Sequence, residues 1–207
     1  MSWLRRNERI QSSAAPAPAD TVPGRVERVT PGLAAFFDGV AEDRSHAVLD
    51  LGPASESSLR VYGRFARWVR FADLLSATTS DTEWAAALAA VPAHPERPYD
   101  LVFAWNLLDR LDPEERPKLV GRLAEITALD ARLYVIVESG GDSPRYPLRF
   151  ALLDADRLSY EPTGRPVLTR APLLPAEVER LIMPFKVARG FTSQTGLREY
   201  VAVRRGR

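Results

Sequence analysis

The stretch AVLDLGPASESSL, residues 47–59, decides the fold. It begins with a short apolar run, reaches Asp50 and Gly52, and continues through small residues into a segment with helical spacing. This order predicts a buried strand, a tight turn and the N-terminus of a helix. In doubly wound α/β proteins, such corners at the carboxyl ends of parallel strands bind nucleotide-like ligands. We therefore expect this corner to decide the function.

Strands and helices alternate on either side of the corner. Thr30 can cap a helix whose first residue is Pro31, and Ser55 or Ser57 can cap the next, which we expect to bury Leu59 and Tyr62. The other predicted elements are strands over residues 68–72, 99–105 and 132–138 and helices over residues 81–91 and 113–129. This alternation indicates a mostly parallel sheet with helices on both faces, which is a three-layer α/β/α fold.

The last third of the chain departs from this rhythm. Residues 140–175 are rich in Pro, Arg and Asp and form an insertion, within which residues 149–153 and 158–160 flank 154–157 like a short hairpin. After a helix over residues 176–183, the strands 185–191 and 197–203 are predicted to form an antiparallel C-terminal hairpin about a turn at residues 193–196.

Composition limits the function classes. With 207 residues we expect one domain, residues 25–207, preceded by a flexible tail and linker, residues 1–24. The chain has no cysteine, and its two histidines have no metal-ligand spacing, so we expect no disulfide and no metal site. A formal net charge of +1 without a dense basic stripe argues against nucleic acid as a partner. Because there is no long apolar run and no signal peptide, we expect a cytoplasmic protein without a membrane span.

The segment from Met1 to Ile10, MSWLRRNERI, combines Trp3 and Leu4 with arginines. It is either a frayed terminus or a short amphipathic helix that contacts an anionic membrane or a protein partner.

The order of elements and several motifs resemble the class I S-adenosylmethionine (SAM) dependent methyltransferases. The motifs are VLDLG at residues 48–52, YDLV at 99–102 followed by WNLL at 105–108, the helix-to-strand passage at 128–137, and REYVAVRR at 198–205. The resemblance covers residues 31–205. It implies a Rossmann-like methyltransferase fold whose last strand is inserted antiparallel, with SAM as the cofactor and a small molecule or a protein as the methyl acceptor.

The resemblance also implies a set of cofactor-binding residues. Asp50, Gly52 and Ala54 correspond to the loop at which the backbone approaches the methionyl part of SAM. Asp73 follows Gly52 by 21 residues, close to the spacing of the acid that binds the ribose hydroxyls. In an alternative register, residues 69–73 are the family's third strand and Asp73 faces the adenine amine. Trp105 and Asn106 lie beside the methyl group.

No catalytic dyad is apparent in the sequence. In-line methyl transfer from a sulfonium needs mainly positioning, so this absence does not argue against the reaction. Asp109 and Glu138, at turn and strand ends, are the candidates for a proton acceptor. The catalytic residues are therefore not assigned from the sequence.

The loop itself departs from the family pattern. Where G-x-G-x-G is expected, the chain has Gly52, Pro53, Ala54, Ser55 and Glu56, so one glycine of three is kept. Pro53 lacks an amide donor, and Ala54 adds a methyl group where the backbone should approach the ligand. Two hypotheses follow: a SAM-dependent methyltransferase, or a methyltransferase-like domain without catalysis that serves as a binding or structural subunit.

In the second hypothesis, the tail, the insertion and the sheet edge are available to a protein partner or a second copy of the chain. A third reading, a dehydrogenase-type nucleotide-binding protein, fits less well because its G-x-G-x-x-G motif is equally broken. An open cleft at the carboxyl ends of the first two strands would favour a bound cofactor. A cleft filled by the loop or by the hairpin would argue against one.

Overall fold

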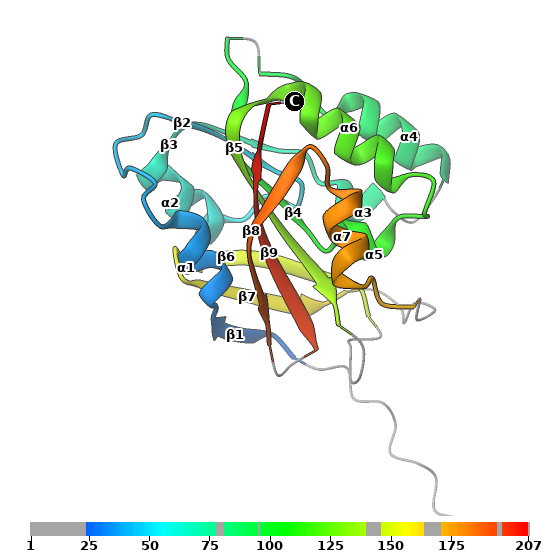
Figure 1. Ribbon diagram of the computed structural model, residues 1–207. Coiled ribbons are helices and arrows are strands. Elements are labelled where there is room, and N and C mark those ends of the chain that lie inside the picture. The colour runs from blue at the N-terminus through cyan, green and yellow to red at the C-terminus, as the bar shows by residue number, and fades with distance from the viewer. Residues whose placement is uncertain are drawn as a thin grey trace, which may run out of the picture.

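The main sheet has six strands in the order β3-β2-β4-β5-β9-β8 (Figure 1). The computed structural model describes residues 24–77, 81–94, 96–139, 146–163, 171–193 and 196–206. The strands are, in sheet order, β3 (Ala66–Phe71), β2 (His46–Asp50), β4 (Tyr99–Trp105), β5 (Thr127–Glu138), β9 (Leu197–Arg204) and β8 (Phe185–Thr192). The pairs from β3 to β5 are parallel, and β9 is antiparallel to both β5 and β8. The predicted doubly wound fold with a C-terminal antiparallel hairpin is confirmed.

Helices cover both faces of this sheet. Figure 1 shows α1 (Pro31–Phe37) and α2 (Glu56–Phe65) on one side. The other side carries α3 (Leu74–Ala77), α4 (Asp81–Ala90), α5 (Leu107–Arg110), α6 (Arg116–Ile126) and α7 (Pro175–Leu181). None of the helices in the described residues combines the length and the apolar character that crossing a membrane requires.

The helix starts follow the capping residues in the sequence. The Thr30 hydroxyl accepts a hydrogen bond from the Leu33 amide at 3.0 Å, and the Ser55 hydroxyl accepts one from the Ser58 amide at 3.1 Å. The expected burial of Leu59 is wrong, because its side chain is 51% exposed. Helix α2 instead buries Ser58, Val61, Tyr62 and Phe65. The polar Ser58 is part of the buried face because its hydroxyl accepts a hydrogen bond from the amide of Leu152 in the insertion, at 2.9 Å.

A second, three-stranded sheet lies across the end of the main sheet at which β4 ends (Figure 1). The predicted hairpin in the insertion forms two of its strands, β6 (Leu148–Asp154) and β7 (Arg157–Pro162). The third, β1 (Val26–Val29), pairs antiparallel with β7 and was not predicted. Its sequence, VERV, has two apolar residues and forms a strand only because β7 offers an unpaired edge. Residues 1–23, which hold the segment from Met1 to Ile10 and nearly all of the predicted linker, lie outside the described residues.

A buried ion pair links the three-stranded sheet, which we call the small sheet, to the main sheet. Arg28 of β1 hydrogen-bonds the carboxylate of Glu199 in β9, which is 1% exposed. The Tyr134 hydroxyl of β5 donates a second hydrogen bond to Glu199 at 2.7 Å. A side chain at Gly32 would run into the Glu199 carboxylate, so this glycine permits the close approach of α1. Strand β1 therefore supplies the counter-charge that Glu199 needs inside the protein.

Removal of this counter-charge should destabilise the whole fold. Arg28→Met leaves a buried carboxylate without its ion pair, and we expect the free energy of unfolding to fall by about 3–5 kcal/mol in urea denaturation. The double variant Arg28→Met with Glu199→Gln keeps an acceptor for Tyr134 without the charge, and it should recover a large part of that loss. A single variant within about 0.5 kcal/mol of the parent protein would contradict this role for Arg28.

Candidate functional site

The carboxyl end of β2 is organised around the side chain of Asp50, which is 1% exposed. One carboxylate oxygen accepts hydrogen bonds from the Gly52 amide at 2.8 Å and from the Trp105 indole nitrogen at 2.5 Å. The other accepts a hydrogen bond from the Tyr62 hydroxyl at 2.7 Å. The donors come from the loop after β2, from the end of β4 and from α2. Asp50 thus joins the three elements that surround the predicted ligand corner.

The side chain of Trp105 lies against the loop after β2. Its φ of 48° lies in the left-handed region, which non-glycine residues rarely adopt. The ring is fully buried, and it stacks on Phe150 of β6 with ring centroids 5.4 Å apart and planes within 2° of parallel. A Cβ atom at position 52 would lie 2.9 Å from the indole nitrogen, so the Gly52 backbone closely approaches the ring. The space beside Gly52 is filled by this indole.

Burial also changes the acidity of Asp50. Desolvation raises the pKa of its carboxyl from the ordinary value near 3.8 to about 6, although the hydrogen bonds from Tyr62, Trp105 and Gly52 oppose this shift. Burial likewise raises the pKa of the Tyr62 hydroxyl, and the nearby Asp50 charge adds to that shift. The tyrosine therefore acts as a neutral hydrogen-bond donor to Asp50.

Asp73 and Asn106 lie apart from this network. Asp73 follows β3, which pairs directly with β2, so the alternative register that made residues 69–73 a third strand is wrong. The Asp73 carboxylate accepts hydrogen bonds from the Ser76 amide at 3.2 Å and the Ser76 hydroxyl at 2.8 Å. Asn106 is buried, with its side-chain oxygen 3.4 Å from the Arg110 guanidinium. Ala54 is exposed.

The two proton-acceptor candidates do meet, at the carboxyl ends of β4 and β5. The Asp109 carboxylate accepts a hydrogen bond from the Glu138 amide at 2.8 Å. Burial raises the pKa of Asp109 to about 7 and raises that of Glu138, and it lowers the pKa of the neighbouring Arg110. The Asp109 carboxyl can therefore take up or release a proton near neutral pH, but its hydrogen bond to the Glu138 amide shows that it also fixes the end of β5.

Sequence reasoning missed the role of Phe150. The insertion was predicted as a hairpin, and the alternation of Leu148, Phe150 and Leu152 with polar or small residues marked one apolar face. That pattern indicated a buried face of the hairpin. What it could not indicate is that the face packs against Trp105.

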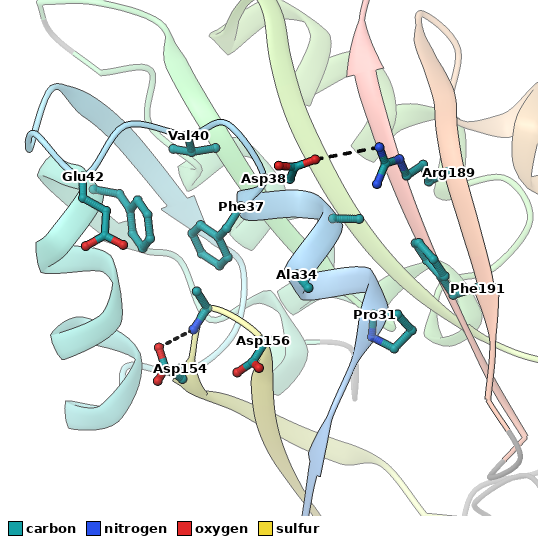
Figure 2. Close-up of a pocket in the computed structure, with 13 residues that line it drawn as sticks. Pro31, Ala34, Phe37, Asp38, Val40, Glu42, Asp154, Asp156, Arg189 and Phe191 are labelled. Atoms are coloured by element: carbon teal, nitrogen blue, oxygen red, sulfur yellow. Dashed lines mark hydrogen bonds and ion pairs between the residues drawn. The ribbon is translucent and has the colours of Figure 1, made fainter.

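Two hollows open on the surface near this region. The larger, of about 720 Å³, lies along α1 between α2 and β8 (Figure 2). Its carboxylates are mostly paired with arginines: Glu42 and Asp154 with Arg64, at 2.5 and 2.6 Å, and Asp38 with Arg189 at 3.8 Å. The smaller, of about 380 Å³, lies on the outer side of the loop after β2, between the start of α2 and the small sheet. We call the smaller hollow the outer pocket.

Comparison with known proteins finds likeness only among solved structures. No protein-family model matches the chain, and no curated protein matches it. A 1,6-didemethyltoxoflavin-N1-methyltransferase from Burkholderia thailandensis is 18% identical, with 85% of this chain and 77% of that chain covered and a TM-score of 0.49. The glycopeptide N-methyltransferase MtfA is 15% identical, with 84% and 90% covered and a TM-score of 0.47. The magnesium protoporphyrin IX methyltransferase of Synechocystis PCC 6803 is 16% identical, with 83% and 76% covered and a TM-score of 0.45. At these values the likeness says nothing about the ligand or the reaction of this chain.

Substitution of Asp50 should change how stability depends on pH. A carboxyl whose pKa rises on folding contributes stability below its unfolded pKa, and this contribution is lost as the pH rises through about 6. Asp50→Asn keeps an acceptor for Trp105 and Gly52 but carries no charge. We therefore expect the free energy of unfolding of the variant, relative to the parent, to rise by about 2–3 kcal/mol between pH 4 and pH 7.

Urea denaturation at a series of pH values measures this difference. Asp130→Asn, a change at an exposed carboxylate, is the matched control and should follow the parent protein at every pH. If the free energy of unfolding of Asp50→Asn changes with pH in the same way as that of the parent protein, Asp50 does not titrate as its burial requires.

Proposed function

We propose that this chain is a methyltransferase-like binding module that does not transfer methyl groups. The observation that carries the proposal is the position of the Trp105 indole, which lies fully buried between Gly52 and Phe150 and donates a hydrogen bond to Asp50. The chain's own side chain thus occupies the corner that the sequence resemblance assigns to SAM.

The residues at this corner do not fit SAM. The cofactor needs the loop backbone to approach its methionyl part, but the Gly52 backbone already approaches the indole ring. Pro53 offers no amide donor. The carboxylate of Asp73, expected to accept the ribose hydroxyls, accepts its hydrogen bonds from Ser76. The Gly52 backbone and the Asp73 carboxylate are therefore both engaged within the protein.

Energetic reasoning supports a closed corner. Displacement of Trp105 breaks a hydrogen bond to a buried carboxylate, worth about 1.5–3 kcal/mol, and an aromatic stack, worth about 0.5–1.5 kcal/mol. It also exposes a large aromatic side chain at about 1.5–3 kcal/mol. Relief of the left-handed backbone conformation of Trp105 would favour opening by about 1–3 kcal/mol. Central values leave about 3.5 kcal/mol against opening, which would weaken SAM binding about 300-fold.

Methyl transfer from SAM to an unidentified acceptor is the second candidate. The observation in its favour is that the strand-loop-helix corner keeps Asp50 and Gly52, while Asp73 lies partly exposed at the carboxyl end of the adjacent strand β3. If Trp105 swings away when cofactor arrives, these residues are still in the order that the family uses.

Calorimetric titration with SAM and S-adenosylhomocysteine separates the two candidates. For the full chain we expect at most weak binding, with a dissociation constant of about 0.3 mM or weaker, and little thermal stabilisation at about 1 mM ligand. Trp105→Ala, checked for folding by circular dichroism, tests whether the indole is what excludes the cofactor. Micromolar binding by the parent protein that Asp73→Ala abolishes would overturn the proposal in favour of the enzyme.

A further inference from the structure

The outer pocket is lined in part by Phe150, which stacks on Trp105, and by the loop after β2. It is lined by the loop residues 53–57, by Arg60 of α2, by residues of β6 and β7, and by Arg25 just before β1. We propose that the outer pocket binds a small organic oxyanion, a phosphate monoester or a carboxylate with an apolar group attached. This inference names the ligand class of the proposed binding module and rests on that proposal.

Three arginines from three different segments converge on the outer pocket: Arg25, Arg60 and Arg149. Each has an exposed carboxylate partner, at 3.3 Å for Arg25, 2.9 Å for Arg60 and 3.8 Å for Arg149. Exposed ion pairs of this kind are worth only about 0–1 kcal/mol. The guanidinium groups are therefore available to an incoming anion, which they bind through paired hydrogen bonds.

The start of α2 adds hydrogen-bond donors to the same side. This ten-residue helix has its Ser58 amide satisfied by the Ser55 hydroxyl. Among the described residues, the amides of Glu56 and Ser57 have no hydrogen-bond partner. Both residues line the pocket, as does the N-cap Ser55. The positive end of the helix macrodipole favours an anion at this place.

Ser159 provides an independent indication of a ligand. It is 3% exposed, and its hydroxyl has no hydrogen-bond partner within the part of the chain that the structure describes. Ser159 pairs with Ala151 across the small sheet, as Glu161 pairs with Arg149, and all four line the pocket. Cross-strand partners share a face of the sheet, so the serine hydroxyl faces the pocket. The Ser159 hydroxyl can therefore donate a hydrogen bond to an anion in the pocket.

The charges and the size of the pocket narrow the ligand. Its lining carries three arginines against two glutamates, Glu56 and Glu161, which leaves one net positive charge. A volume of about 380 Å³ is at the small end of ligand pockets. Phe150, Pro53 and Ala54 form an apolar wall beside the donors. One oxyanion joined to one ring or short chain matches these features, whereas a polymer would not fit inside.

Phenyl phosphate and benzoate are suitable probes, because they share the ring and differ in the anion. With the full chain, we expect calorimetry to give a dissociation constant of about 1 mM or tighter for at least one of the two probes. The probe that binds more weakly shows which anion, phosphate or carboxylate, the pocket disfavours. Arg149→Gln and Ser159→Ala should each weaken binding about tenfold. Arg157→Gln removes an exposed arginine of the same small sheet outside the pocket and should leave the affinity unchanged.

Three results would overturn the inference. The first is the absence of heat with either probe at about 10 mM. The second is a loss of affinity in Arg157→Gln as large as that in Arg149→Gln. The third is equal affinity for inorganic phosphate and phenyl phosphate, because the apolar wall would then contribute nothing to binding. Because SAM and these probes are different ligands, the two proposals fail separately. Micromolar SAM binding would overturn the proposal of a non-methylating module. Absence of probe binding would overturn only the proposal of a ligand in the outer pocket.

Discussion

The hydrogen bonds of the Asp50 carboxylate are the interaction on which the rest of this structure depends. A buried carboxylate is tolerated only when its oxygens are satisfied, and here the donors are a loop amide, a tyrosine of α2 and the indole of Trp105. The indole in turn supports Phe150, and Phe150 belongs to the small sheet that β1 ties to Glu199 through Arg28. The corner and the small sheet are therefore one connected arrangement of packing and hydrogen bonds, although they belong to different sheets.

The parts of the fold that could be predicted from the sequence are those set by local pattern. Continuous apolar runs gave the strands β2, β4 and β5, and Thr30 and Ser55 gave the helix starts. Strand β1 could not be predicted, because VERV has no strong pattern and its pairing with β7 joins segments far apart in the chain. For the same reason Phe150 could be assigned to a hairpin but not to its place against Trp105.

The candidate site illustrates why one residue type can support opposite interpretations. Gly52 was expected because a ligand must approach the backbone closely, and a close approach is present, but the approaching group is an indole of the same chain. The sequence allowed Trp105 at the end of β4 either to line a ligand site or to pack in the core, and its side chain is fully buried. The deciding contact is the hydrogen bond from its indole to Asp50 of β2, made by a residue whose φ is 48°. A backbone angle that depends on tertiary packing cannot be deduced from residue identity.

The left-handed turn at Trp105 also bears on how this corner can evolve. Replacement of Trp105 by a small residue would take one donor from a buried carboxylate and one stacking partner from Phe150, and the loop would still contain Pro53. Opening of the corner therefore requires changes at several positions, each of which is harmful until the others are made. Single substitutions are therefore tolerated more easily on the exposed surface of the protein than at this corner, where each side chain satisfies or packs against another.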